Sequence, residues 1–243
     1  LDDWPPPGAT PTAYYLHGDG SLSPDRPDMR QASTTYTFDP ADPVQTVGGN
    51  VSARVGDGAF DQRERADLPG AKPPYLPFSA RSDVLVFQTA PLEQDVVVAG
   101  PIEVVLFAST SAVDTDFTAK LLDVYPPSED FPAGFAMNVT DAILRMSYRD
   151  DRTTRGLVRP GEVYRLVIRP FPTANLCKKG NRIRVDISSS NFPRFDVNPN
   201  TGEPLGMNRR MTTADNTVYH DRNRASHVVL PVLPVRPAEL TQR

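Results

Sequence analysis

Short runs of alternating apolar and polar residues, separated by turn-forming residues, organise this chain. The clearest run is 182–188, RIRVDIS, in which isoleucine and valine alternate with arginine and aspartate. Successive side chains of a β-strand point to opposite faces, so this pattern predicts a half-buried strand. Further strands are predicted from similar runs between Pro, Gly, Asp and Asn clusters, at 13–16, 34–38, 84–89, 96–99, 102–109, 117–125, 142–148, 163–169 and 227–232.

Two of these regions carry more information than the rest. Residues 102–109 are largely apolar on both faces, which favours an inner strand with both sides covered. Residues 189–202, which follow the 182–188 strand, are rich in Ser, Pro, Asn and Gly and therefore favour a long shaped loop. The loop also contains Phe192 and Phe195, and this predicts that it folds against an apolar surface.

The fold class predicted from these runs is all-β. No segment has a convincing period of 3.6 residues, and 26 of the 243 residues are proline, about twice the average usage of about 5%. Proline in a helix interior removes a hydrogen bond and clashes with the preceding turn. Many short strands with turns between them predict a two-sheet sandwich or a barrel. We expect one domain, with residues 1–80 as a loop-rich N-terminal segment and residues 81–243 as the sandwich core.

Charge and hydropathy exclude several classes of partner. The formal net charge of −4 lacks the basic footprint of a nucleic-acid binder. No run approaches the length of about 20 apolar residues that spans a bilayer, and no secretory signal stands at the start. A soluble protein is predicted, with the cytoplasm favoured but the compartment left open. The opening residues, LDDWPPP, resemble a linker, so we interpret the chain as a fragment of a longer protein.

The sequence lacks the nucleophile motif of an α/β-type serine hydrolase. That motif, G-x-S-x-G, exposes a serine on a strained turn between a strand and a helix, and it does not occur here. Serines 188–190 follow a strand without flanking glycines. They could join a private triad with one of the histidines, but strand-end serines that satisfy backbone groups are the favoured interpretation. The histidines are His17, His220 and His227.

For each of the other candidate sites, a structural role is a simpler explanation than a functional one. Asp114 and Asp116 could offer two carboxylates to Ca²⁺, but aspartates that cap a turn before a strand are favoured. Cys177 is the single cysteine and is interpreted as a small buried thiol rather than a catalytic one. Asn50 and Asn138 begin glycosylation triplets, a weak pattern. A solvated ion-pair surface, or less favourably an anion clamp, is predicted for Asp141, Arg145, Arg149, Asp150, Asp151, Arg152 and Arg155.

The loop after the 182–188 strand permits two interpretations. Its amide, acidic and aromatic side chains could form a sugar-binding shelf. Packing against another domain explains the same residues, because interface energy concentrates where aromatic surface is buried. The residues in question are Asn191, Phe192, Phe195, Asp196, Asn198 and Asn200.

Several strings, in this order, resemble the C-terminal domain of the cocaine esterase / X-Pro dipeptidyl-peptidase group of serine hydrolases, and the likeness extends over nearly the whole chain. The strings are WPPP at 4–7, YTFDPADP at 36–43, the double glycine at 48–49, GAFDQR at 58–63, VDTDFTAKLLDV at 113–124, ILR at 143–145 and ISSSNFPRFDVNPNTG at 187–202.

The resemblance implies a jelly-roll sandwich of the galactose-binding-like type that follows an α/β-hydrolase domain and a helical cap. It also implies that the catalytic Ser, Asp and His lie in the hydrolase domain, and that this chain holds no catalytic residue, cofactor or metal. In the group, the loop after the double glycine approaches the acyl side of the substrate cleft. Small residues stand there in this sequence, so an acyl pocket would be roomier or more polar. The cleft candidates are Asn50, Val51, Ser52 and Ala53.

This chain departs from the group at Asn181, where a histidine is common before the Arg-Ile pair, and no role is assigned through that position.

Our leading hypothesis is therefore a non-catalytic accessory domain of a hydrolase that cleaves esters, amides or Xaa-Pro dipeptides. Its partners would be the α/β-hydrolase domain of the same parent chain and, through the parent, a small ester, amide or peptide substrate, while homo-oligomerisation stays open. An independent carbohydrate-binding module is the alternative, and a self-sufficient hydrolase ranks last. The residues expected to dock the hydrolase domain are Phe60, Asp61, Gln62, Arg63, Phe192 and Phe195.

Overall fold

The computed structural model describes residues 3–48, 59–68 and 70–234, and these residues form a β-sandwich. Single 3₁₀ turns lie at η1 (Phe78–Ala80) and η2 (Met146–Tyr148). The strands are β1 (Thr10–Leu16), β2 (Leu22–Ser23), β3 (Ser33–Phe38), β4 (Leu85–Gln88), β5 (Val96–Gly100), β6 (Glu103–Thr110), β7 (Asp116–Tyr125), β8 (Phe135–Arg145), β9 (Tyr164–Ile168), β10 (Thr173–Cys177), β11 (Arg182–Ser188), β12 (Ala214–Tyr219) and β13 (His227–Leu233).

The larger sheet has nine strands, in the order β10-β5-β13-β6-β12-β3, with β1, β2 and β9 joined to this path. Strand β1 pairs antiparallel with β13, and β3 pairs antiparallel with β12, so the first and last strands of the chain lie side by side. Strand β6 pairs with β12, β13 and β9. Most of its residues are buried, as predicted from its apolar character on both faces.

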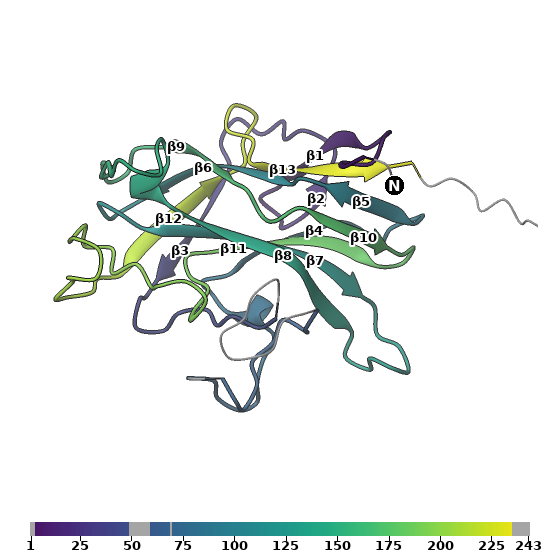
Figure 1. The fold of residues 1–243 in the computed structure, drawn as a ribbon, viewed down its shortest axis with the longest axis horizontal. Coiled ribbons are helices and arrows are strands. Elements are labelled where there is room, and N and C mark those ends of the chain that lie inside the picture. The colour runs from purple at the N-terminus through teal and green to yellow at the C-terminus, as the bar shows by residue number, and fades with distance from the viewer. Residues whose placement is uncertain (1–2, 49–58, 69, 235–243) are drawn as a thin grey trace, which may run out of the picture.

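The smaller sheet has four antiparallel strands in the order β4-β11-β7-β8. In Figure 1 it lies below the larger sheet, and the β7–β8 hairpin extends toward the lower right. The main core fills the space between the sheets. From the smaller sheet it receives Phe117, Ala119, Leu121, Ile183, Val185 and Ile187, which pack with Val104, Leu106 and Leu166 of the larger sheet. The predicted all-β jelly-roll sandwich is confirmed.

A third layer of loops lies on the other face of the smaller sheet. We call it the cover and define it as residues 43–48, 59–68, 70–82 and 190–195. It has a small apolar core, formed by Val44, Val47, Leu68 and Phe78 of the cover together with Val84, which follows it in the chain. Backbone hydrogen bonds join its parts, because Phe192 N–H donates to the Val44 carbonyl at 2.9 Å and Thr46 N–H donates to the Phe192 carbonyl at 2.6 Å. Figure 1 shows these loops, mostly blue, beneath the smaller sheet.

The structure corrects some of the predicted strands. The run at 142–148 is in fact the end of β8, which starts at Phe135, followed by the turn η2. A bulge between Leu121 and Leu122 interrupts the register of β7 with β8, so the β8 sequence does not alternate regularly. Strands β2, β10 and β12 were not predicted. In β12 the buried position Asn216 is polar, and this hides its alternation.

Candidate functional site

Charged side chains fill the face of the smaller sheet that lies under the cover, which we call the outer face. Arg184 and Asp186 are two residues apart on β11 and therefore share this face. The Arg184 Nε and Nη2 atoms each donate to an Asp186 carboxylate oxygen at 2.6 Å. Their side chains are 7% and 5% exposed. The strand was predicted to be half-buried, but its charged face is buried as well, because the cover lies on it.

A second buried ion pair joins the cover to the sheet. Arg194, in the loop after β11, pairs with Asp141 of β8, whose side chain is 1% exposed. The side-chain amides of Asn138 and Asn191 also donate to Asp141, at 3.2 and 3.3 Å. The Arg194 guanidinium lies 5.0 Å from the centre of the Phe195 ring. Asp141 therefore anchors the loop through a charge-assisted contact with Arg194 and an amide contact with Asn191, while Asn138 of the same strand also donates to the carboxylate.

Lys120 of β7 lies buried between these pairs. Its Nζ atom donates to Gln62 Oε1 of the cover at 3.3 Å and lies 5.5 Å from the centre of the Phe78 ring. Burial lowers the pKa of Lys120, while the nearby carboxylates of Asp141 and Asp186 act in the opposite direction. Lys120, Arg184 and Arg194 thus lie with the carboxylates of Asp141 and Asp186 away from solvent, an arrangement that is costly unless the geometry of each pair is held firmly.

The predicted docking residues at 60–63 have different environments. Gln62 is 1% exposed, and its side-chain amide donates to the carbonyls of Val47 and Phe60. Gln62 therefore holds the cover together rather than facing outward. Asp61 accepts from Ala136 N–H at 2.9 Å and pairs with Arg63 at 2.9 Å. Phe60 and Arg63 are half-buried, with 39% of the Arg63 side chain exposed.

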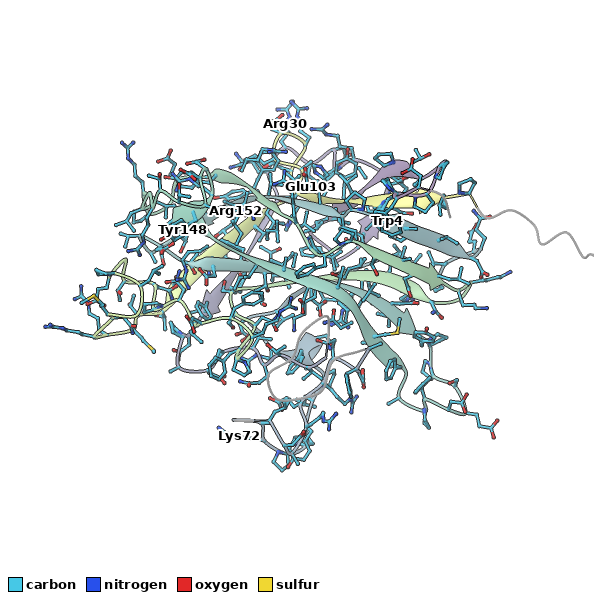
Figure 2. The ribbon with its side chains drawn as sticks, viewed as in Figure 1. Trp4, Arg30, Lys72, Glu103, Tyr148 and Arg152 are labelled. Atoms are coloured by element: carbon cyan, nitrogen blue, oxygen red, sulfur yellow. The ribbon has the colours of Figure 1, made fainter. Side chains whose placement is uncertain are left out.

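The predicted docking residues Phe192 and Phe195 are both half-buried and border different cavities. Phe192 borders a cavity of ≈570 Å³ beside the loop after β11. Phe195 borders a cavity of ≈470 Å³ that is also lined by Tyr148 and Arg152. Figure 2 shows these last two side chains close together at one end of the molecule. The docking assignments of all these residues stay predictions, as do those of the cleft candidates Asn50, Val51, Ser52 and Ala53, which lie outside the described residues.

The strand-end serines have structural roles. Ser190 Oγ accepts from Val44 N–H at 2.8 Å, and Ser188 Oγ lies 2.5 Å from Thr118 Oγ1. Ser189 Oγ lies 2.7 Å from the Tyr36 hydroxyl and accepts from the Asn216 amide. Within the described part of the chain, none of these serines hydrogen-bonds to a histidine. The contacts of Ser188 and Ser190 match the favoured interpretation, in which strand-end serines satisfy backbone groups.

The two candidate calcium ligands are engaged with arginines. Asp116 forms a bidentate pair with Arg145, at 2.8 and 3.0 Å. Asp114 pairs with Arg155 and also accepts from Ser147 N–H at 3.0 Å. Among the described residues there is no group of three or more His, Cys, Asp and Glu side chains that could hold a metal ion.

The predicted solvated surface of acidic and arginine residues is therefore wrong in part. Asp141 is buried, and the arginines Arg145 and Arg155 each bind a buried aspartate. Arg152 is exposed as predicted, and so is Asp150, which pairs with Arg149. The sequence showed the charges but not the loops that cover some of them.

The amide side chains that a sugar-binding shelf would need are buried. Asn191, Asn198 and Asn200 are each 1–2% exposed. Asn198 donates to Asp116 at 2.7 Å, and Asn200 donates to the Thr212 carbonyl at 2.7 Å. These amides hold the loop in shape and are already engaged in hydrogen bonds inside the domain.

Remaining single residues are also structural. Asn138 is 2% exposed and cannot accept a glycan in the folded domain. Asn181 donates to the buried Asp123 carboxylate at 2.8 Å. Burial raises the pKa of the Cys177 thiol to about 12, which makes it a poor nucleophile. Within the residues described, no helix has the length and apolar character needed to cross a bilayer.

Sequence reasoning missed the buried position of Lys120 under the cover. A signal existed, because Lys120 is the one cation within the mainly apolar run 117–124, FTAKLLDV. A lysine at such a position in a strand needs a partner from elsewhere in the chain.

Comparisons with known proteins agree with this description. Residues 1–229 match the family described as X-Pro dipeptidyl-peptidase C-terminal non-catalytic domain. The chain is 38% identical over 242 residues to cocaine esterase of Rhodococcus sp. (strain MB1 Bresler), covering 95% of this chain and 39% of that protein.

Solved structures give the same picture. An aminopeptidase from the marine sediment archaeon Thaumarchaeota archaeon has a TM-score of 0.82 at 29% identity, covering 96% of this chain and 38% of that one. An α-amino acid ester hydrolase has a TM-score of 0.80 at 30% identity, with the same coverages of 96% and 38%. The chain thus spans about two fifths of the length of the relatives it matches. The resemblance inferred from the sequence strings is confirmed, and the chain belongs to the family of X-Pro dipeptidyl-peptidase C-terminal non-catalytic domains.

Proposed function

We propose that this non-catalytic domain is part of a longer serine hydrolase of the acyl-esterase or Xaa-Pro dipeptidyl-peptidase type. In this proposal it supports an α/β-hydrolase domain and lines part of that domain's substrate cleft. The esterase and aminopeptidase names of longer relatives support the proposal. The lack of a G-x-S-x-G motif in the sequence agrees with a nucleophile that lies elsewhere in the parent.

The buried charges of the outer face are the observation that carries the docking role. Solvated charges would be cheaper than buried ones, so a face of ion pairs under loops indicates that the shape of the cover matters. The Asp141–Arg194 pair fixes the loop that presents Phe192 and Phe195. Gln62, in contact with Lys120, fixes the segment that presents Phe60 and Arg63. The hydrolase domain would dock on surface residues whose loops are fixed by these buried contacts with the smaller sheet.

The described residues on either side of the proposed cleft segment belong to the cover. Val47 is fully buried in the cover, and Phe60 packs against the cover's apolar core. Both ends of the segment that contains Asn50 to Ala53 are therefore fixed on the outer face. We propose that this segment faces the acyl side of the cleft, where its small side chains would leave a roomy or polar pocket.

We also propose that residues 1–243 act as one unit. Strand β1 pairs with β13 and β3 pairs with β12, so the segment 1–80 contributes strands to the larger sheet. The loops of this segment also supply most of the cover.

The experiment is a double substitution in the parent hydrolase, Arg63→Ala with Phe195→Ala, measured by kcat/KM and by thermal unfolding. Arginine and aromatic side chains are enriched among the interface residues whose truncation costs more than about 1 kcal/mol, so we expect the double substitution to lower kcat/KM by about tenfold or more. The matched control is Leu176→Ala with Arg165→Ala, a pair exposed on the larger sheet. Wild-type activity and wild-type stability in the double variant would remove the docking assignment.

A further inference from the structure

A cavity of ≈400 Å³ opens where the cover ends beside the β7–β8 hairpin. Its charged wall contains Arg182 and Arg184 of β11 and Arg63 of the cover. The two β11 arginines share the outer face because they are two residues apart. Arg63 reaches the cavity from a backbone bridge with Pro77. Guanidinium groups from distant parts of the sequence thus meet in one hollow.

The positive charge of this wall is not fully neutralised. Arg63 pairs with Asp61, and Arg184 pairs with Asp186. Arg182 has no carboxylate partner among the described residues, and its Nη1 atom donates to the Thr89 carbonyl at 2.7 Å. That contact fixes the guanidinium and leaves its other N–H groups available. One cationic charge therefore remains in the cavity.

Arg182 differs in this respect from the other arginines of the described chain. Those without a carboxylate partner, such as Arg30, Arg165 and Arg209, are exposed and solvated. Those that are buried or half-buried, apart from Arg182, have such a partner. A half-buried and oriented guanidinium that lacks a carboxylate partner among the described residues would be stabilised by an incoming anion.

Much of the remaining wall is apolar and aromatic, and its other polar residues are Asp61, Ser79 and Gln88. Val124 lies beside Arg182 in the register of β7 with β11, and Tyr125 and Phe135 come from the two arms of the hairpin. The Tyr125 and Phe135 ring centres are 6.1 Å apart, and Phe131 at 38% exposure stacks on Phe135 at 4.7 Å. Arginine and aromatic residues are the types enriched in protein interfaces. The wall suits a protein segment better than a fully hydrated ion.

The acids of the hairpin itself do not occupy the cavity. Glu129 and Asp130 are exposed near its tip and are not among the lining residues. Asp61 does line the cavity, but it already binds Arg63 and the Ala136 N–H. The described acids at this end of the molecule therefore leave Arg182 without a carboxylate partner.

We propose that this cavity receives an aspartate or glutamate side chain from the hydrolase portion of the parent chain. The inference rests on the proposed function, because it identifies a specific contact of the docked state. A carboxylate matches the planar fork of a guanidinium and can accept two parallel hydrogen bonds. Arg182 provides that fork, Arg63 adds free N–H donors beside it, and the hairpin aromatics exclude water around the pair.

The experiment compares variants of the parent protein by the rate of limited proteolysis between its domains. That rate follows the population of the undocked state when opening is fast relative to cleavage. Arg182→Gln leaves the incoming carboxylate buried without a cation, so we expect cleavage to accelerate by about tenfold or more. Arg182→Lys keeps the charge but loses the planar fork, so we expect cleavage to accelerate by about threefold, clearly less than for Arg182→Gln. The matched control is Arg165→Gln, on an exposed and unpaired arginine of β9, which should cleave like the wild type.

Arg182→Gln also removes the hydrogen bond to the Thr89 carbonyl, so a second variant tests the cavity while Arg182 is kept. Val124→Glu places a carboxylate next to Arg182 from within the chain, where it would compete with the incoming side chain. We expect it to accelerate cleavage as Arg182→Gln does. Equal rates for the Gln and Lys variants, or wild-type rates for Arg182→Gln and Val124→Glu, would overturn the inference.

Failure of the inference can be told apart from failure of the proposed function by treating the same samples with a fluorophosphonate probe. If a serine outside residues 1–243 is labelled but the Arg182 variants are cleaved at the wild-type rate, only the proposed carboxylate contact in this cavity is wrong. If no serine is labelled, the proposed function is wrong, and so is the carboxylate contact that rests on it.

Discussion

The two faces of the smaller sheet are both buried, but by different means. The inner face packs Phe117, Ile183 and Ile187 against the larger sheet in a continuous apolar core. The outer face packs Lys120 and the Arg184–Asp186 pair against loops. Apolar burial stabilises without regard to direction. Charged burial stabilises only when each group meets a partner at the correct angle, so the outer face selects one arrangement of the cover.

The difference suggests a division of roles within one sheet. The inner face supplies the stability of the sandwich, and the outer face supplies the shape of the surface that we propose docks the hydrolase domain. Substitutions on the two faces should therefore differ in additivity and in pH dependence as well as in size.

Phe117→Ala should have the largest effect on stability. Phe117 is fully buried in the main core, and Phe→Ala changes in cores cost about 3–5 kcal/mol through lost burial and the cavity left behind. Urea denaturation measures the change, with Leu176→Ala on an exposed position as the control. A loss below about 1 kcal/mol would mean that the inner face is not the main source of stability.

Asp186→Leu should lower the free energy of unfolding by about 3 kcal/mol, the lower end of the range for breaking a buried ion pair. The lower end applies because Arg184 lines a cavity that water can enter. The double variant Arg184→Met with Asp186→Leu should instead lie within about 1 kcal/mol of the wild type, since no unpaired charge remains.

Urea denaturation of both variants sharpens the comparison, because apolar pairs on the inner face should not recover in this way. A double variant as unstable as the sum of its single changes would contradict the account of the outer face.

Gln62→Ala should cost about 1–3 kcal/mol, the penalty for leaving buried polar groups without partners. The change would free the Val47 and Phe60 carbonyls and the Lys120 ammonium. Hydrogen exchange of the cover should rise, while exchange in β6 stays unchanged. Equal increases in both regions would show that the cover and the core open together.

Lys120→Met should have the smallest effect at neutral pH and a distinctive effect on the alkaline side. The folded-state pKa of Lys120 lies below its ordinary value of 10.5. The unfolded chain therefore binds more protons in the window below 10.5, and stability contributed by this group rises as the pH increases through that window.

Urea denaturation from neutral pH up to 10.5 tests this, with exposed Lys72→Met as the control. Lys72 lies at the outer tip of the cover in Figure 2. We expect Lys120→Met to reduce the rise in the free energy of unfolding toward alkaline pH, and we expect Lys72→Met to leave that rise unchanged. Identical slopes in both variants would mean that Lys120 is not desolvated.

The sequence was sufficient for the sandwich but not for the cover. Alternation located β11 and β7 because an apolar core imposes a period of two. The same alternation made Arg184 and Asp186 look solvent-facing, since a polar face under loops has the same pattern as one in water. Gln62 illustrates the limit further: it lies among residues expected to face a partner, yet it holds the cover from within. Contacts across more than 50 residues, such as Lys120 with Gln62, leave no local pattern.

The most direct test of the central claim is to label the parent protein with a fluorophosphonate probe and map the modified serine by mass spectrometry. We expect one adduct, on a serine outside residues 1–243, together with ester or amide hydrolysis that the label abolishes. A stoichiometric adduct on any serine within residues 1–243 would mean that this domain carries its own activated nucleophile, and it would contradict the non-catalytic role.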